Sequence, residues 1–372
     1  MNVNFKKIVC SFLCFIILGT TVAFCQIETH SPSYILMDKS TGSVLLKKNE
    51  NETLPMASVT KIMTMLLTFE EIEKGNLSLE DKIIASANAS SMGGSQIYLK
   101  ENEEMSLETL IKSIFVASAN DACVAIAEKI GGTVDEFVNR MNERAKELGL
   151  KNTSFKNPHG LDDDGHYSSA HDLAVISREL MKYDIRKYTT IWQDTIRNGE
   201  FTLTNTNKLI RFYPDATGLK TGSTSKAGYC MSATAQKGNM ELIAVVLGAD
   251  TSKNRFNDAK ALLDYGFSNY KILSLVKKET KIGDCDITYG KEEKVSVYPK
   301  ENVDWLIKAN DKSQIKTEIQ TDKLSAPVKK GQKAGMMYFF KDGKEIARME
   351  LVCERNVEKK NYFDIVRDFM VS

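Results

Sequence analysis

Residues 57–73, ASVTKIMTMLLTFEEIE, form an almost wholly apolar segment that Pro55 precedes and Gly75 follows. Proline interrupts regular structure ahead of a helix, and a glycine just beyond the last apolar residue commonly ends one. Apolar side chains on nearly every turn indicate a helix that other elements cover. The sequence therefore predicts a buried helix over residues 57–73.

Further helical and extended segments surround this helix. Residues 106–130 and 134–148 have the periodicity of helices, with an interruption near Ser118, and residues 255–265 form a last helical run. Strands are predicted before and after these helices, at residues 34–37, 43–46, 217–221, 228–236 and 240–247. Because strands from both ends of the region flank the helices, we expect a mixed α/β fold in which helices cover an antiparallel sheet.

The length of 372 residues is sufficient for two domains. From residue 271 onward, short alternating segments such as residues 294–298 predict a small all-β domain. Residues 361–372 place aromatic and aliphatic side chains loosely on one helical side, so this amphipathic tail either contacts a membrane peripherally or docks onto the protein. We expect an α/β domain over residues 26–270, a β-rich domain over residues 271–360 and the tail over residues 361–372.

The first 25 residues have the pattern of a signal peptide. Two lysines precede an apolar run over residues 8–18, which is too short to span a membrane comfortably. Small residues at the positions that a signal peptidase reads favour cleavage before Gln26; an uncleaved anchor and a lipoprotein acylated on Cys25 are the alternatives. The pattern predicts an exported protein that acts outside the cytoplasm.

Charge and cysteine content exclude several classes of function. Lys and Arg number 50 and Asp and Glu number 49, so no overall positive field favours nucleic acid. The cysteines beyond the signal peptide are widely separated and form no C-x-x-C pair, which argues against a zinc site. They are Cys123, Cys230, Cys285 and Cys353. We expect buried thiols, with one or two disulfides as the alternative, and neither a metal nor another cofactor.

Ser58 and Lys61 stand three residues apart at the start of the predicted buried helix. This spacing puts the hydroxyl and the amine on the same side, one turn apart. A serine hydroxyl needs an adjacent base to act as a nucleophile, and a lysine can be that base when burial and nearby cations lower its pKa. The pair alone is weak evidence, because a helix-capping serine with a solvated lysine has the same pattern.

Two further motifs strengthen the case for nucleophilic catalysis. Ser118-Ala119-Asn120 interrupts two helical runs, so Ser118 and Asn120 can both point from a short connection into a cleft; a helix cap is the alternative. Lys220-Thr221-Gly222 ends a strand-like run, where period 2 sends Lys220 and Gly222 to one face. The glycine would let a substrate backbone approach, whereas an exposed edge strand is the alternative explanation.

The three motifs in this order, S-x-x-K, S-x-N and K-T-G, resemble those of penicillin-binding proteins of low molecular mass, the serine-type D-alanyl-D-alanine carboxypeptidases. The resemblance covers about residue 35 to the C-terminus. It also includes residues 157–161 (NPHGL), 166–173 (HYSSAHDL) and 204–207 (TNTN). It implies the catalytic fold shared with serine β-lactamases, in which an antiparallel sheet is covered by helices.

The resemblance implies a chemical role for each matching residue. Ser58 would be the acylated nucleophile, Lys61 its general base and Ser118 the proton relay toward the leaving D-alanine nitrogen. Asn120 would hold the substrate amide, and Lys220 would keep the site cationic.

Substrate binding is implied for the remaining residues. The backbone amides of Ser58 and Ser223 would form the oxyanion hole, and Gly222 belongs to the same strand end. Thr221 and Arg255 would receive the terminal carboxylate of a peptide that ends in D-Ala-D-Ala. Some relatives carry histidine at the position of Ser223, which bears on the rate and pH dependence of deacylation.

The resemblance implies an enzyme that removes the terminal D-alanine from peptidoglycan stem pentapeptides and so limits cross-linking of the cell wall. β-Lactam antibiotics would acylate the same serine and act as covalent inhibitors. The expected location is the cell wall or the outer face of the cytoplasmic membrane. A β-lactamase is the first alternative, but no carboxylate motif for activating deacylating water stands out between Asn120 and Lys220. A non-catalytic module that binds wall peptides is the second.

Three histidines near Asp162, Asp163 and Asp164 suggest other chemistry at first sight. The spacing of His159, His166 and His171 does not fit the helical H-E-x-x-H pattern of a metal site. A Ser-His-Asp triad is disfavoured because the G-x-S-x-G elbow is absent.

Overall fold

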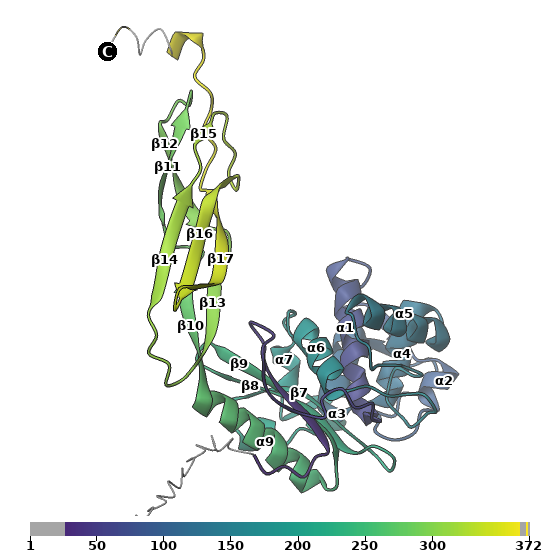
Figure 1. Cartoon of the computed structure of the whole chain (residues 1–372). Helices are drawn as coiled ribbons and strands as arrows, with labels where there is room; N and C mark the ends of the chain where they lie inside the picture. Colours follow the sequence, from purple (N-terminus) through teal and green to yellow (C-terminus); the bar gives the residue numbers. More distant parts are fainter. Residues whose placement is uncertain (1–26, 365–369, 371–372) are drawn as a thin grey trace, which may run out of the picture.

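The computed structural model describes residues 27–364 and residue 370. The predicted signal peptide over residues 1–25, and residues 365–369 and 371–372 of the predicted tail, lie outside the described residues. In Figure 1 the chain forms an α/β part, which ends with α9 (Ser252–Asn269), and a slender part made of strands that extends away from it.

The α/β part is built on one five-stranded antiparallel sheet with the order β2-β1-β9-β8-β7. Its strands are β1 (Ser33–Asp38), β2 (Val44–Lys48), β7 (Ala216–Thr224), β8 (Gly228–Lys237) and β9 (Met240–Ala249). β1, from the start of the region, pairs with β9, from its end, and sets Ile35 opposite Val245. This arrangement confirms the predicted sheet built from both ends of the region.

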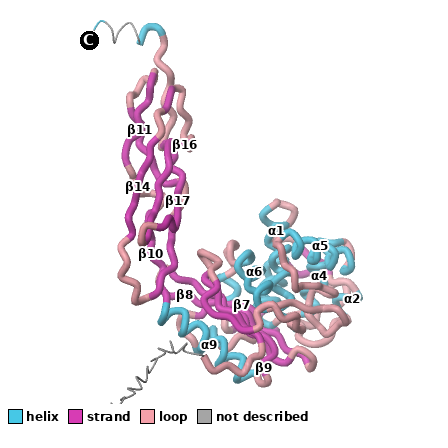
Figure 2. The backbone as a smooth tube through the Cα atoms, in the orientation of Figure 1, coloured by secondary structure: helices cyan, strands magenta, loops and turns pink. Residues whose placement is uncertain are grey.

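Alternate residues of the central strands face two different cores. Ile243 and Val245 of β9 belong to the core that contains α1 (Lys61–Glu73). Leu242 and Ala244 face the opposite way, into the core that contains α9. Figure 2 shows α9 on one side of β7, β8 and β9 and helices such as α1, α4 and α6 on the opposite side. Both faces of the sheet are therefore covered, and β1 and β9 are accordingly buried along almost their whole length.

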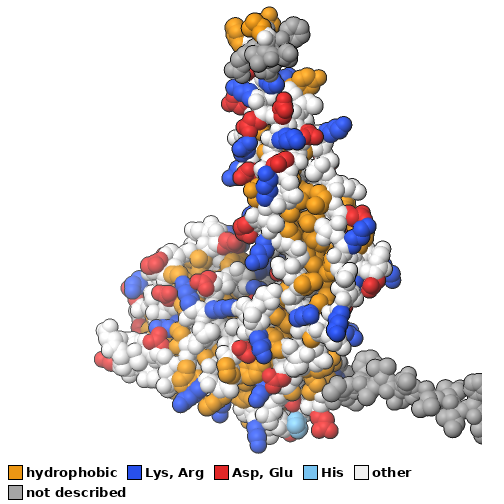
Figure 3. Space-filling model, turned by 90° about the vertical axis from the view of Figure 1, so that its left-hand side faces the viewer, with side chains coloured by type: hydrophobic (Ala, Val, Ile, Leu, Met, Phe, Trp, Pro, Cys, Tyr) orange, Lys and Arg blue, Asp and Glu red, His pale blue; other side chains and the backbone are white. Residues whose placement is uncertain are grey.

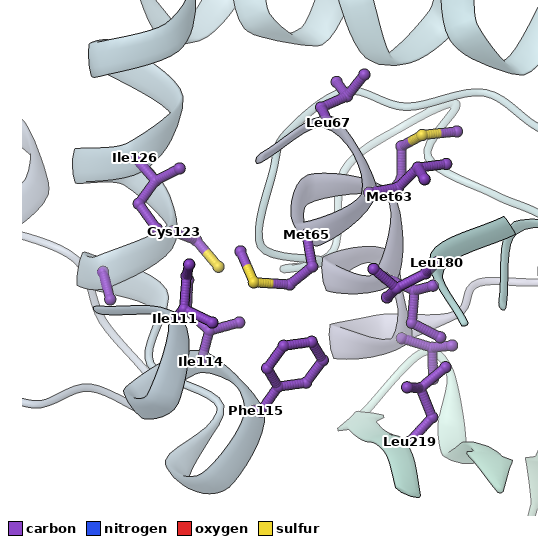
Figure 4. Close-up of a cluster of buried hydrophobic side chains, with 14 of the residues drawn as sticks. Met63, Met65, Leu67, Ile111, Ile114, Phe115, Cys123, Ile126, Leu180 and Leu219 are labelled. Carbon is purple, nitrogen blue, oxygen red and sulfur yellow. The ribbon is translucent and has the colours of Figure 1, made fainter. Parts of the chain in front are cut away.

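The helices of the larger core surround α1. They are α2 (Ala87–Ser90), α3 (Leu107–Ala117), α4 (Asn120–Gly131), α5 (Val134–Glu147), α6 (Ala170–Leu180) and α7 (Arg186–Thr189). α8 (Leu209–Phe212) instead contributes Leu209 to the core that contains α9. Every residue from 61 to 69 in α1 is buried. In Figure 4, Met65 of α1 lies among Ile114 and Phe115 of α3 and Cys123 of α4. The structure confirms a buried helix, although residues 57–60 form a separate 3₁₀ turn, η1 (Ala57–Thr60), ahead of it.

Several elements were not predicted, and the longest of them is α6. α6 begins at the capping residue Ser169, whose hydroxyl accepts a hydrogen bond from the backbone of Asp172. Two small hairpin-like pairs lie outside the main sheet, together with the turn η2 (Arg197–Gly199). The pairs are β3 (Lys82–Ile84) with β4 (Glu104–Ser106), and β5 (Gln193–Ile196) with β6 (Phe201–Thr204). Elements of three or four residues are too short to show a clear periodicity in the sequence.

The slender part is all-β, as predicted. One sheet has the order β14-β16-β17-β12-β11-β15, and β10 pairs with β13 in another. The strands are β10 (Tyr270–Val276), β11 (Gly283–Thr288), β12 (Lys294–Pro299), β13 (Val303–Lys308), β14 (Ile315–Thr321), β15 (Leu324–Ser325), β16 (Lys333–Lys341) and β17 (Lys344–Cys353). Side chains such as Val297, Phe339 and Leu351 form a separate small core. Figure 3 shows more hydrophobic side chains gathered along one outer face of this part.

Candidate active site

Ser58 lies in η1, which runs directly into α1. Lys61 is the first residue of α1 and is fully buried. Its Nζ atom lies 2.8 Å from Ser58 Oγ. The structure therefore brings the hydroxyl and the amine of the first motif into direct contact.

The other two partners of Lys61 Nζ can only accept hydrogen bonds. They are Asn120 Oδ1 and the backbone carbonyl of His159, each at 2.6 Å. A neutral amine would donate its two protons to these oxygens and turn its lone pair toward the Ser58 hydroxyl. Burial lowers the pKa of Lys61 to about 8, while the negative charge of Asp121 opposes this shift. Geometry and electrostatics both suit a base for Ser58.

Ser118 ends α3 in the left-handed conformation, with a φ of 64°, and α4 begins two residues later at Asn120. This break confirms the predicted interruption and turns the Ser118 side chain toward the third motif. The amide of Asn120 is engaged at both ends, because its Nδ2 donates to the carbonyl of Gly93 at 2.7 Å while its Oδ1 accepts from Lys61.

Lys220 projects from β7 toward the same place. Its buried Nζ donates to Ser118 Oγ at 2.9 Å and to the carbonyl of Thr221 at 2.8 Å. Burial holds the pKa of Lys220 well below its usual value, and the nearby charge of Lys61 lowers it further. The three motifs thus meet at one point, with two amines and two hydroxyls in contact as two pairs.

Packing within the protein requires a glycine at position 222, whether or not a substrate is bound. A Cβ atom at this position would lie 2.7 Å from the amide nitrogen of Ser58 and 2.9 Å from the carbonyl oxygen of Met56, both closer than real contacts allow. The sequence suggested that the glycine makes room for a substrate backbone. In the structure the absence of a side chain at Gly222 makes room for the turn that carries Ser58, and so lets β7 pack directly against that turn.

Arg255 enters the site from α9. Its Nη1 atom donates to the carbonyl of Gly222 at 3.1 Å, and its guanidinium lies over the ring of Phe256 at 4.5 Å. Its Nε atom is buried and has no hydrogen-bond partner among the residues that the structure describes. Burial lowers the pKa of Arg255 to about 10, which still leaves the side chain charged at neutral pH. Within residues 27–364 no carboxylate pairs with this buried cation, so it suits an anionic ligand.

A cavity of about 130 Å³ opens beside these residues. It is lined by Ser58, Ser95, Ser118, Thr206, Thr221, Gly222, Ser223 and Arg255. Lys61 and Lys220 are buried and reach the cavity through the hydroxyls of Ser58 and Ser118 that line it. Asn120 is also buried and contacts Lys61 from behind the cavity lining.

Sequence reasoning missed Ser95 and Thr206. The hydroxyl of Thr221 donates to that of Thr206 at 2.7 Å, and the backbone of Asn120 donates to the Ser95 carbonyl at 2.7 Å. Thr206 lies in residues 204–207, which are part of the family resemblance, so this match could have identified Thr206 as a site residue. Nothing local to Ser95 in the sequence marks it as a site residue.

The three histidines take up separate structural positions. His159 Nδ1 accepts from the backbone of Leu161, His166 contacts Thr60, and His171 contacts Asp172. Across residues 27–364 and 370, no group of three or more metal-binding side chains comes together. The cysteines Cys123, Cys230, Cys285 and Cys353 are buried free thiols, which confirms the expectation for them.

Comparisons with known proteins match both parts of the chain. Residues 20–251 match the model of the peptidase S11 family, D-alanyl-D-alanine carboxypeptidase. Residues 270–359 match the C-terminal domain of penicillin-binding protein 5.

Individual relatives cover almost the whole chain. The D-alanyl-D-alanine carboxypeptidase DacF of Bacillus subtilis is 44% identical over 93% of this chain and 90% of its own length. DacA of Escherichia coli is 33% identical over 92% of this chain and 87% of its own. Among solved structures, penicillin-binding protein 5 of Haemophilus influenzae superimposes with a TM-score of 0.74 at 32% identity, covering 90% of this chain and 99% of that one. The chain therefore belongs to the D-alanyl-D-alanine carboxypeptidase family of serine peptidases.

Proposed function

We propose that this protein is a serine D-alanyl-D-alanine carboxypeptidase that removes the terminal D-alanine from peptidoglycan stem peptides through an acyl-enzyme on Ser58. The contact between Lys61 Nζ and Ser58 Oγ carries the proposal, because the two other partners of Lys61 leave its lone pair to the hydroxyl. Membership of the family supports the substrate class.

Acylation would begin with proton transfer from Ser58 to Lys61 while Ser58 Oγ bonds to the carbonyl carbon of the penultimate D-alanine. The negative charge that develops on the carbonyl oxygen would be stabilised by the backbone N–H groups of Ser58 and Ser223. The start of α1 adds the partial positive charge of a helix N-terminus at the same place.

The bond to the terminal D-alanine then breaks, and its nitrogen takes up a proton. Ser118 would deliver that proton, since its hydroxyl lies between the cleft and the amine of Lys220. The proton that Lys61 took from Ser58 would then pass to Ser118, so that Lys61 is neutral and Ser118 protonated again. Water would next attack the ester carbon, with Lys61 taking its proton and returning it to Ser58 Oγ as the ester bond breaks. This second attack releases the shortened peptide and restores Ser58.

Substrate recognition would use the charged side of the cleft. The terminal carboxylate would bind Thr221 Oγ1 and the guanidinium of Arg255. Asn120 would hold the substrate amide by exchanging the Gly93 carbonyl, which its Nδ2 contacts at 2.7 Å, for a substrate carbonyl. Gly222 lets β7 approach the turn that carries Ser58, so a peptide bound along β7 would lie beside the nucleophile.

Release of D-alanine from a peptide ending in D-Ala-D-Ala tests this proposal directly. The wild-type chain should release one D-alanine per peptide, and Ser58→Ala should release none while keeping its circular dichroism spectrum and melting temperature. Undiminished release by Ser58→Ala would exclude the serine mechanism.

We also propose how the chain is divided and where it acts. Residues 1–25 would be a signal peptide, residues 26–270 the catalytic domain and residues 271–360 a β-rich domain, so the enzyme would work outside the cytoplasm at the cell wall. Residues 361–372 would form a tail that contacts the membrane surface. Tyr362, Phe363 and Met370 in it are 75%, 80% and 76% exposed, which favours a peripheral contact over docking onto the protein. In the described residues no helix is long and apolar enough to cross a membrane.

A further inference from the structure

We propose that His166 and Thr60 are positioning residues that orient the peptide unit between Ala57 and Ser58, and with it the oxyanion-binding N–H of Ser58. This inference rests on the proposed function, because it assigns a task to the Ser58 amide during acylation. The argument starts from the backbone just before the nucleophile.

Ala57 has a φ of 48°, a left-handed conformation that costs free energy for any residue other than glycine. Such a conformation persists only where surrounding contacts hold it. The carbonyl oxygen of Ala57 is held by Thr60, whose Oγ1 lies 2.8 Å away. A carbonyl can only accept, so the single hydroxyl proton of Thr60 is used in this contact.

Thr60 Oγ1 must therefore accept from its other partner, His166 Nε2, which lies 2.8 Å away. The opposite ring nitrogen, Nδ1, accepts from the backbone N–H of Lys156 at 2.9 Å. Both contacts together fix one tautomer, a neutral imidazole with its proton on Nε2. Hydrogen bonds thus run in one direction, from Lys156 through His166 and Thr60 to the Ala57 carbonyl.

Packing and backbone pairing hold His166, the residue at the far end of this series of hydrogen bonds. His166 is 6% exposed, and its ring packs edge to face on Phe155 with 6.0 Å between ring centres. The next residue, Tyr167, is paired with Ser154 through two backbone hydrogen bonds. Burial is the main reason that the pKa of His166 is lowered to about 4; Asp163 and Asp162 oppose this shift, and Lys156 adds a smaller lowering effect. The ring is therefore neutral at neutral pH, as the hydrogen bonds require.

A second contact presses on the same carbonyl. A Cβ atom at Gly160 would lie 2.0 Å from the Ala57 oxygen and 2.8 Å from Thr60 Oγ1. The loop that carries Gly160 therefore packs directly against the Ala57 carbonyl and the Thr60 hydroxyl. The neighbouring His159 is the residue whose carbonyl accepts from Lys61. One loop thus holds the base through His159 and the turn of the nucleophile through Gly160 and His166.

Holding the Ala57 carbonyl also determines where the Ser58 N–H points. In a trans peptide unit the C=O and N–H groups point in opposite directions. With the carbonyl directed at Thr60, the N–H of Ser58 is directed to the other side, where a Cβ at Gly222 would come within 2.7 Å of this nitrogen. That side belongs to the cleft, which Gly222 and Ser58 both line. A donor fixed in advance stabilises a developing oxyanion better than one that must reorient.

Paired substitutions test the inference on the full-length protein. Thr60→Val removes the hydroxyl and His166→Leu removes both ring nitrogens, whereas Thr60→Ser keeps a hydroxyl and His166→Gln keeps an acceptor and a donor at a similar separation. The rate constant for acylation by benzylpenicillin should fall about tenfold or more in Thr60→Val and His166→Leu, with a much smaller change in the dissociation constant of the initial complex. Thr60→Ser and His166→Gln should recover most of the rate. The double variant Thr60→Val with His166→Leu should be no slower than Thr60→Val alone.

Thr68→Val is the matched control, because Thr68 is equally buried in α1 and donates only to the backbone of Thr64. It should lower the melting temperature and leave the acylation rate unchanged. Should Thr60→Val not fold, the comparison of His166→Leu with His166→Gln decides. Acylation at the wild-type rate by the folded variants that lack these groups would overturn the positioning role. Failure of the wild-type protein to form an adduct would instead overturn the proposed function.

Discussion

Lys220 Nζ lies 2.9 Å from Ser118 Oγ, although the two residues are 102 positions apart in the chain. The left-handed turn at Ser118 and the strand β7 bring them together. This contact completes a site in which the hydroxyls of Ser58 and Ser118 are each paired with a buried amine.

Activity should depend on pH through Lys61. Burial lowers the pKa of Lys61 to about 8. The base must be neutral to accept a proton, so kcat/KM should rise with pH below this value and level off above it. A pH profile of D-alanine release between pH 6 and 9 measures this dependence. A rate that does not change across that range would contradict the assignment of Lys61 as the base.

Ser118→Ala should slow catalysis more than it weakens binding. Its hydroxyl is the proposed route for the proton that the departing D-alanine needs, and losing such a group typically costs about 100-fold to 10,000-fold in rate. Steady-state kinetics with a D-Ala-D-Ala peptide should show the loss mainly in kcat. Ser113→Ala is the control, because Ser113 is also buried but donates to the backbone within α3. Equal kinetics for the two variants would rule out the relay.

Arg255→Gln should remove the preference for a free terminal carboxylate. A hydrogen bond to a charged group contributes about 1.5–3 kcal/mol, so the wild-type protein should prefer the free acid over the C-terminal amide by about tenfold or more. The variant should process both peptides with similar, low kcat/KM values. Arg348→Gln, an exposed change in β17, should keep the wild-type preference. A preference that survives in Arg255→Gln would place the carboxylate elsewhere.

Removal of residues 361–372 should separate membrane contact from catalysis. The exposed side chains of Tyr362 and Phe363 make no large buried contact with the protein, so the shortened chain should fold and release D-alanine at the wild-type rate. It should lose sedimentation with phosphatidylglycerol vesicles, which the chain with the tail should show. Loss of folding on truncation would mean that the tail docks on the protein.

Ser58 and Lys61 could be paired from sequence because their spacing is local, whereas Ser118, Asn120 and Lys220 were assigned through the family resemblance. The three-residue separation of Ser58 and Lys61 places both on one side of a helix, and the structure puts their functional atoms 2.8 Å apart. The sheet was also predictable, since strands at both ends of the region have strong apolar runs. β1 and β9 pair as expected.

Other parts of the site leave no local trace in the sequence. The His159 group that contacts Lys61 is a backbone carbonyl, 98 positions away, and every residue has such a group. The reason for Gly222 is likewise a close approach between β7 and the Ser58 turn, which depends on the packing of distant segments. The sequence argued against metal binding and a triad for His159 and His166, but it gave no indication of the contacts that they make in the folded chain.

Covalent trapping by a β-lactam tests the central claim most directly. The strained amide and adjacent carboxylate of benzylpenicillin resemble the D-Ala-D-Ala terminus, and the opened ring stays attached beside the ester, where it hinders the entry of water. Intact-mass analysis after brief incubation should show one drug molecule added to the wild-type protein. Peptide mapping should place it on Ser58, and excess D-Ala-D-Ala peptide should slow its formation. An adduct of equal yield on Ser58→Ala, or none on the wild-type protein, would contradict the account.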